Sequence, residues 1–367
     1  MRLSRLILAS SFVLLIAAIP ASAQQKVLPL WPHATPEPAQ TAEPEKDVTT
    51  DKDALFDGQR SRRFTNVTQP TMSIYQPTAV PSSGAAALVF PGGGYVRLAW
   101  DGEGVDSCKW LNSIGVTCLL IKYRVPETGR YPENFADLED AQQAMRIARA
   151  HAAEWHIDPS RIGVVGFSAG ANLAVLLSSH PDDAHVASTP AAADANASID
   201  ARANFAIVVY PAYLIQMPEA LPNAREGTPR PAPPEFPTLN PVYEPTKFTP
   251  PTFLIQAEND RAWGRNAPVY YEALANAGVP AELHMYSTGG HGFGLHPVGR
   301  PEEHWTQLAT AWLRANSIIP PSIPETRRGA NGGQSYSTPA APCPNTQVPP
   351  PGRPDKTPPP PTDPACW

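Results

Sequence analysis

RIGVVGFSAGANLAVLL, residues 161–177, joins two kinds of local structure through one turn. Its first part is β-rich, which is typical of a buried strand, and its last part is rich in alanine and leucine, which favours a helix. Between them, Gly166-Phe167-Ser168-Ala169-Gly170 matches the pattern G-x-S-x-G. A serine at a strand-to-helix turn adopts a strained conformation, and flanking glycines let neighbouring backbones pass close by. This context indicates that Ser168 is a nucleophile.

The sequence on both sides of this turn alternates strand-like and helix-like segments. The predicted strands are residues 86–90, 116–123, 161–167, 204–210, 252–256 and 282–286. The predicted helices are residues 104–113, 134–155, the segment from the serine turn to 177, 266–277 and 302–315. Such repeated units predict an α/β fold with a mostly parallel central sheet and helices on both faces. Ligands bind such sheets at the carboxyl ends of the strands.

A nucleophilic serine needs a base within hydrogen-bond reach. The sequence Gly289-Gly290-His291-Gly292-Phe293-Gly294 places a histidine in a glycine-rich loop directly after the last predicted strand. His296 and His304 are the nearest alternatives in the chain. We interpret His291 as the general base because of its loop and its position after the strand.

The base in turn needs an acid that orients it. Asp260 and Glu258 both lie in the loop that leaves the predicted strand 252–256, and spacing alone excludes neither. A carboxylate in this loop could instead cap the following turn. We favour Asp260, and the chain order serine, aspartate, histidine is the one that hydrolases with this type of serine turn use.

Acyl transfer also needs two N–H donors for the oxyanion that develops on the substrate. The Ala169 N–H is one candidate because it follows the nucleophile. The loop Pro91-Gly92-Gly93-Gly94-Tyr95 follows a predicted strand, and its glycines can present N–H groups without obstruction by side chains. Since proline has no N–H, Gly93 and Gly94 are the further candidates. A plain tight turn is the alternative interpretation of this loop.

The first 23 residues resemble a secretory signal peptide. Arg2 and Arg5 precede an apolar run at residues 6–19, and Ala21-Ser22-Ala23 resembles a cleavage site. The run of about 14 residues is shorter than the roughly 20 that a spanning helix needs, which favours cleavage over a retained membrane anchor. We therefore expect the mature chain to begin near Gln24, to be secreted or periplasmic, and to have no membrane attachment.

The rest of the chain divides by composition. Residues 24–319 form the predicted catalytic domain, which begins with an irregular arm at 24–80. Residues 320–367 are rich in proline and are predicted to be a disordered tail, best explained as a linker. The formal net charge of −6 and the absence of a basic run argue against nucleic acid as a partner. Nothing in the sequence indicates the oligomeric state.

Four cysteines fall into two pairs, Cys108 with Cys118 and Cys343 with Cys366. An oxidising compartment permits a disulfide within each pair, while the alternative for the first pair is two small buried apolar side chains. No cysteine or histidine spacing suggests a zinc site, and the expected chemistry needs no metal and no cofactor.

Taken together, these blocks resemble a family of secreted, esterase-like α/β hydrolases that includes acetylxylan esterases and feruloyl-esterase-like enzymes. The resemblance runs from Leu28-Pro29-Leu30-Trp31-Pro32 to about residue 313 and rests on residues 91–95, 110–125, 157–174, 251–266 and 278–295. It implies an α/β-hydrolase fold, Asp260 as the acid, and a small acyl ester as substrate, such as an acetyl group on a polysaccharide or oligosaccharide.

Two departures from the family pattern lie near the expected pocket. Gly170-Ala171-Asn172 stands where the family often has Gly-Gly-His after the alanine, and Arg261-Ala262-Trp263-Gly264 replaces a valine-rich turn. Tyr95 and Trp263, with Trp100, could form an aromatic platform for a sugar or could be core residues. The departures at residues 170–172 and 261–264 bear on the acyl or sugar preference rather than on the reaction.

The resulting hypothesis is a serine esterase that hydrolyses short-acyl carboxylic esters through an acyl-enzyme. A serine peptidase would use the same triad, but such peptidases usually have a large extra domain, and only about 70 residues precede the predicted sheet. A non-catalytic binding protein on the same scaffold is a further alternative, although such proteins normally lose a triad residue, and none is lost here.

Overall fold

The computed structural model describes residues 26–36, 41–53, 55–56, 59–126, 131–132, 134–182, 196, 198–216, 237–297 and 299–321. The predicted signal peptide, residues 322–367 of the predicted tail, and the pair Cys343 and Cys366 lie outside these residues. The predictions for those segments therefore stay predictions.

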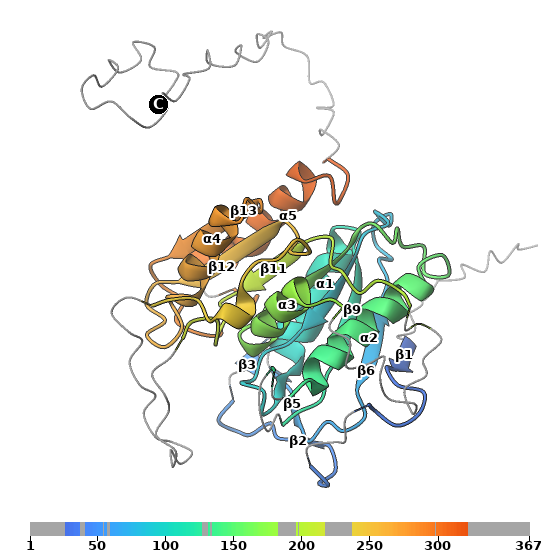
Figure 1. Ribbon diagram of the computed structural model, residues 1–367. Coiled ribbons are helices and arrows are strands. Elements are labelled where there is room, and N and C mark those ends of the chain that lie inside the picture. Colours follow the sequence, from blue (N-terminus) through green and yellow to red (C-terminus); the bar gives the residue numbers. More distant parts are fainter. Residues whose placement is uncertain are drawn as a thin grey trace, which may run out of the picture. The chain divides into compact units, whose positions relative to one another are not determined.

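An eight-stranded sheet forms the centre of the fold (Figure 1). The strands in spatial order are β1 (Lys26–Pro29), β6 (Thr71–Tyr75), β9 (Thr117–Lys122), β7 (Ala86–Phe90), β10 (Ile162–Phe167), β11 (Ala206–Val209), β12 (Thr252–Ala257) and β13 (Ala281–Tyr286). From β9 to β13 all neighbours are parallel, while β1 and β6 pair antiparallel. The predicted mostly parallel sheet is confirmed.

Helices cover both faces of this sheet. Successive side chains of a strand point to opposite faces, so apolar strands expose apolar side chains on both faces, and both need to be covered. In β7, Leu88 and Phe90 belong to one apolar cluster and Val89 belongs to the other. The first cluster includes side chains of α2 (Ala136–Ala150), α3 (Ala169–Ser179) and α4 (Asn266–Asn276). The second includes side chains of α1 (Asp106–Ser113) and α5 (Trp305–Ala315). The core is therefore two apolar layers separated by the sheet.

The prediction of an irregular arm at residues 24–80 is wrong. β1 and β6 extend the main sheet by two antiparallel strands. Short strands make two further small sheets: β2 (Lys46–Asp47), β5 (Arg63–Thr65) and β8 (Leu98–Ala99) in one, and β3 (Leu55–Phe56) with β4 (Gln59–Arg60) in the other. The arm was hard to recognise because antiparallel strands need no crossover helix, so the strand–helix alternation is absent there.

Two predicted helices are preceded by turns of another helical type, and one further helical turn was not predicted. A π-helical turn, Trp100–Val105, leads into α1, and a 3₁₀ turn, Pro301–His304, leads into α5. A further 3₁₀ turn, Pro241–Tyr243, lies in the Pro-rich connection after β11, where the side chain of Asn240 accepts a hydrogen bond from the Val242 N–H.

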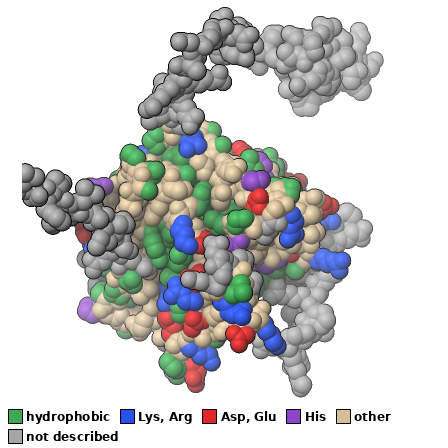
Figure 2. Space-filling model, turned by 180° about the vertical axis from the view of Figure 1, so that it is seen from behind, with side chains coloured by type: hydrophobic (Ala, Val, Ile, Leu, Met, Phe, Trp, Pro, Cys, Tyr) green, Lys and Arg blue, Asp and Glu red, His purple; other side chains and the backbone are tan. Residues whose placement is uncertain are grey.

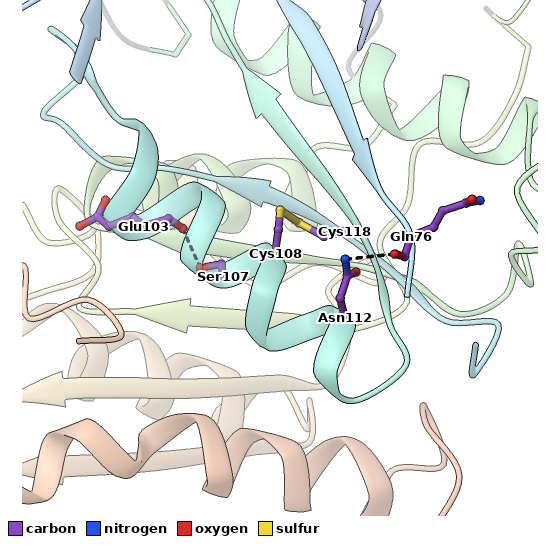
Figure 3. The surroundings of a disulfide bond; sticks show 6 residues. All are labelled: Gln76, Glu103, Ser107, Cys108, Asn112 and Cys118. Carbon is purple, nitrogen blue, oxygen red and sulfur yellow. Dashed lines mark hydrogen bonds between the residues drawn. A yellow bond between two sulfur atoms is a disulfide. The ribbon is translucent and has the colours of Figure 1, made fainter. Parts of the chain in front are cut away.

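Cys108 and Cys118 form a disulfide, so these two side chains are not free thiols (Figure 3). The bond joins α1 to β9 with a Cα–Cα distance of 5.1 Å, and both residues are fully buried. It fixes the helix on the second apolar layer against the central sheet.

On the face drawn in Figure 2, lysine and arginine side chains lie close to aspartate and glutamate side chains. Ion pairs among the described residues include Arg62 with Asp101 and Lys122 with Glu45. Among the described residues, no helix is both long and apolar enough to cross a bilayer.

Candidate active site

Ser168 lies at the turn between β10 and α3, as the sequence predicted. Its backbone has φ 53° and ψ −115°, a conformation that non-glycine residues rarely adopt. The turn is tight: a Cβ at Gly166 would lie 2.2 Å from the Gly170 carbonyl oxygen, and one at Gly170 would lie 2.0 Å from the Phe90 oxygen. Only glycine fits these two positions. The close packing around the turn holds the serine in its strained conformation.

A chain of two hydrogen bonds joins the three predicted catalytic side chains. Ser168 Oγ lies 2.7 Å from His291 Nε2, and His291 Nδ1 lies 2.6 Å from Asp260 Oδ2. When the Nδ1–H donates to the carboxylate, the Nε2 lone pair is free to accept the serine proton. The Asp260 side chain is 2% exposed and that of His291 is 30% exposed.

Asp260 is fixed by further donors in its own loop. Its Oδ1 accepts hydrogen bonds from the N–H groups of Ala262 and Trp263, and its Oδ2 accepts one from the Gln256 side chain. Glu258, the alternative acid, is exposed, and no bond between its carboxylate and His291 occurs in the described part of the chain. The structure therefore brings Asp260, and not Glu258, to the imidazole.

The loop that carries His291 is anchored at its start. The Gly290 N–H donates to Asn259 Oδ1 at 2.7 Å, which ties this loop to the loop of the acid. The two alternative histidines face other groups: His296 Nε2 lies 3.7 Å from an Asp106 carboxylate oxygen, and His304 Nε2 lies 3.4 Å from one of Glu303.

The glycine loop after β7 lies beside Ser168. A Cβ at Gly92 would come within 2.8 Å of Ser168 Cβ, so the two backbones are in close contact. Gly93 and Gly94 have φ of 134° and 67°, and neither their N–H groups nor that of Ala169 donate to another described residue. These three N–H groups are therefore available to a ligand at Ser168.

Two buried residues near the glycine loop were not identified from the sequence. Glu103 comes eight residues after Tyr95, the last residue of the loop, and its carboxylate accepts hydrogen bonds from the Gly92 N–H and the Tyr210 hydroxyl. Burial raises the pKa of Glu103, although these hydrogen bonds oppose the rise. In the sequence, only the position of Tyr210 at the end of the predicted strand 204–210 indicated that it could lie near the site.

The two predicted substrate-binding residues belong to one aromatic wall, which we define as Tyr95, Tyr213 and Trp263. The rings of Tyr95 and Tyr213 stack with centroids 6.1 Å apart, and Tyr213 meets Trp263 edge to face at 4.6 Å. Trp263 lies 6.5 Å from the His291 ring, so the wall reaches the candidate base. Tyr213, which was not predicted from the sequence, connects the other two.

Tyr95 and Trp263 are also largely buried, so they contribute to the core as well as to the wall. The Tyr95 hydroxyl donates to Asn172 Oδ1 at 2.8 Å. Trp100 belongs to the other apolar layer, where it packs edge to face on Phe64 at 6.0 Å. Trp100 is therefore a core residue and not part of the aromatic wall.

A family model for the alpha/beta hydrolase fold matches residues 87–295, which is more than half of the chain. This chain belongs to the α/β-hydrolase family. The match includes the glycine loop, the serine turn, the acid loop and the histidine loop. The fold class inferred from the sequence is confirmed.

Relatives of this chain include proteins named as an esterase and as a xylanase. An acetylxylan esterase from Xylanibacter ruminicola is 31% identical over 244 residues, which cover 64% of this chain and 46% of the relative. Endo-1,4-beta-xylanase B of Butyrivibrio fibrisolvens is 27% identical over 56% of this chain and 32% of its own length. The chain therefore spans less than half the length of these two relatives.

A solved hydrolase structure is covered almost completely by this chain. The acetyl ester-xyloside bifunctional hydrolase from Caldicellulosiruptor lactoaceticus is 29% identical, with a TM-score of 0.56 over 80% of this chain and 97% of that chain. The resemblance to acetylxylan esterases that the sequence blocks indicated is thus confirmed.

Proposed function

We propose that this protein is a serine esterase that hydrolyses short-acyl carboxylic esters through a Ser168–His291–Asp260 triad. The observation that carries the proposal is the chain of two short hydrogen bonds, 2.7 Å and 2.6 Å, from the serine hydroxyl through the imidazole to a buried carboxylate. The esterase names of the relatives support the same reaction.

In the proposed mechanism, His291 takes the proton of Ser168 as Oγ attacks the ester carbonyl carbon. The N–H groups of Gly93, Gly94 and Ala169 hold the oxyanion of the tetrahedral intermediate. The intermediate collapses, and His291 returns the proton to the departing alcohol. Water, deprotonated by His291, then attacks the acyl-enzyme and releases the acid.

The proposed substrate is a small acyl ester, with an acetyl group on a carbohydrate as the leading case. The names acetylxylan esterase and acetyl ester-xyloside hydrolase support this choice. The aromatic wall adds a physical argument, because it reaches within 6.5 Å of the His291 ring and its bulky side chains limit the room for a long acyl chain near the candidate base.

We further propose that the mature protein is secreted or periplasmic. The signal-like first 23 residues support this location. The Cys108–Cys118 disulfide supports it independently, because disulfides persist mainly in oxidising compartments.

Hydrolysis of p-nitrophenyl esters from acetate to octanoate, by the full chain and by its Ser168→Ala variant, tests the proposal. We expect serine-dependent turnover that falls steeply as the acyl chain lengthens. Turnover of peptide substrates alone would favour a serine peptidase. A chain without any activity above Ser168→Ala would favour a binding protein on this scaffold, and acetylated xylan is the next substrate if acetate is preferred.

A further inference from the structure

A buried carboxylate outside the proposed triad lies directly against the glycine loop. Glu103, in the π-helical turn before α1, is 8% exposed. Its Oε2 accepts the Gly92 N–H at 2.6 Å, and its Oε1 accepts the Tyr210 hydroxyl at 2.9 Å. Burying a carboxyl group costs free energy unless it is hydrogen-bonded. The two donors offset this cost and fix the orientation of the Glu103 side chain.

Tyr210 continues this connection to the histidine loop. The residue directly follows β11, is fully buried, and has a φ of 36°. Its hydroxyl accepts the Gly294 N–H at 3.2 Å. Its ring meets the rings of His291 and Phe293 edge to face, with centroids 5.3 Å and 4.6 Å apart. Three hydrogen bonds therefore run from Gly92 to Gly294.

We propose that Glu103 and Tyr210 are positioning residues that fix the glycine loop and the histidine loop relative to each other on either side of Ser168. This inference rests on the proposed esterase function, and the pair is called the Glu103–Tyr210 bridge below. Its chemical task is to keep the Gly93 and Gly94 donors and the His291 base at their distances from one reacting carbonyl. Misplacement by about 1 Å at such a site can cost on the order of 100-fold in rate.

The bridge also determines which loop N–H groups remain for a substrate. Pro91 has no N–H, and the Gly92 N–H is committed to Glu103. The next two donors, on Gly93 and Gly94, are the first that a ligand can use. Gly92 itself admits no side chain, since a Cβ there would lie 2.7 Å from the Phe167 carbonyl oxygen. The carboxylate and the serine turn therefore hold the loop between them.

The segment that carries Glu103 is anchored to the sheet. The Glu103 backbone oxygen accepts a hydrogen bond from Ser107 Oγ at 2.6 Å, one turn further on (Figure 3). The next residue, Cys108, is bonded to Cys118 of β9. The bridge thus starts from a part of the molecule that is covalently attached to the central sheet, which limits its freedom to drift.

The test compares Tyr210→Phe and Glu103→Gln with wild type in the full chain. Tyr210→Phe removes one oxygen and keeps the ring against His291. We expect kcat for p-nitrophenyl acetate to fall by roughly 10-fold to 100-fold while KM stays within about twofold. The reason is that less ordered loops hold the transition state less well, whereas the substrate can still enter and bind. The double variant should be no slower than the slower single variant, since both changes break one connection.

Tyr270→Phe is the matched control, because Tyr270 is equally buried but lies on α4, which contributes no residue to the site. We expect this variant to keep the wild-type kcat. A Tyr210→Phe protein that folds with a cooperative transition and keeps the wild-type kcat would overturn the bridge and leave the esterase proposal intact.

A second readout separates failure of the bridge from failure of the proposed function. A fluorophosphonate probe labels an activated serine whatever its ester substrate, and amide hydrogen exchange reports loop order without any reaction. We expect slower labelling and faster exchange at residues 91–97 and 289–296 in Tyr210→Phe. Wild type that turns over no ester would refute the esterase function alone, whereas identical exchange of both segments in wild type and variant would refute the bridge.

Discussion

Replacing Asp260 with asparagine tests the geometry of the proposed triad at its most defined point. The change keeps the shape of the side chain but replaces one acceptor oxygen with an NH₂ donor. Oδ1 can keep its two backbone donors, the Ala262 and Trp263 N–H groups. The new NH₂ group would then face both His291 Nδ1 and the Gln256 amide, which are donors in wild type.

The imidazole can restore a hydrogen bond only by changing its tautomer. Nδ1 would then accept from the asparagine, and Nε2 would carry a proton toward Ser168 Oγ, 2.7 Å away. In this tautomer His291 has no lone pair for the serine proton. We expect kcat to fall by about 10⁴-fold, the magnitude found for the corresponding change in a serine protease, which is about 5.4 kcal/mol of transition-state stabilisation.

The assay is the steady-state hydrolysis of p-nitrophenyl acetate at neutral pH, with Glu258→Gln as the matched control. Glu258 lies in the same loop two residues earlier, is exposed, and should keep activity within about twofold of wild type. A folded Asp260→Asn protein with activity within tenfold of wild type would refute the role of Asp260. Loss of activity in Glu258→Gln alone would make Glu258 the orienting acid.

Three further predictions concern stability and selectivity. Replacing Cys108 and Cys118 by alanine should lower the free energy of unfolding by about 3 kcal/mol, since the bond closes a short loop; equal urea midpoints for variant and wild type would contradict this. Tyr213→Ala should raise the ratio of butyrate to acetate hydrolysis about tenfold by opening the aromatic wall, and an unchanged ratio would remove Tyr213 from the acyl pocket. Burial raises the pKa of Asp137 to about 6. This pKa lies above the usual value of 3.8 for an aspartate in the unfolded chain, so the stability that the protonated carboxyl group contributes is fully present below about pH 4 and is lost as the pH rises through 6. The asparagine variant does not ionise. The difference in unfolding free energy between Asp137→Asn and wild type should therefore grow by on the order of 1 kcal/mol from about pH 5 to about pH 8. Urea midpoints at both pH values measure this gain, and parallel curves for the two proteins would argue against it.

The parallel part of the fold could be predicted because each strand has a local signal. Five of the six parallel strands, β7, β9, β10, β11 and β12, are short apolar runs, and all six, β13 included, lie within a few residues of their predicted ranges. β6 gave no such signal, because TMSIY is five residues long, has a polar side chain at its centre, and pairs antiparallel without a helix on either side. Its three central residues are nevertheless buried, which tertiary pairing and not local pattern determines.

The candidate site divides in the same way. Ser168, Asp260 and His291 follow strands in loops with recognisable residues, so their convergence could be inferred from the topology of a parallel sheet. Glu103 and Tyr210 are 107 residues apart in the chain, and no spacing rule joins a buried glutamate to a tyrosine at that distance. Tyr213 was missed for a related reason. Its position between Tyr95 and Trp263 depends on the path of the chain after β11, where the sequence shows only a Pro-rich connection.

The departure from Gly-Gly-His at Asn172 has a structural explanation in the aromatic wall. Asn172 is buried in the first turns of α3, and its Oδ1 accepts hydrogen bonds from the hydroxyls of Tyr95 at 2.8 Å and Tyr243 at 3.4 Å. A compact amide oxygen can accept from two tyrosines at once, whereas a histidine offers at most one acceptor nitrogen in its neutral form. Because the Tyr95 ring stacks on Tyr213, the orientation of the wall depends on this buried oxygen. The residue that differs from the family pattern therefore holds two tyrosine hydroxyls in place, four positions after Ser168.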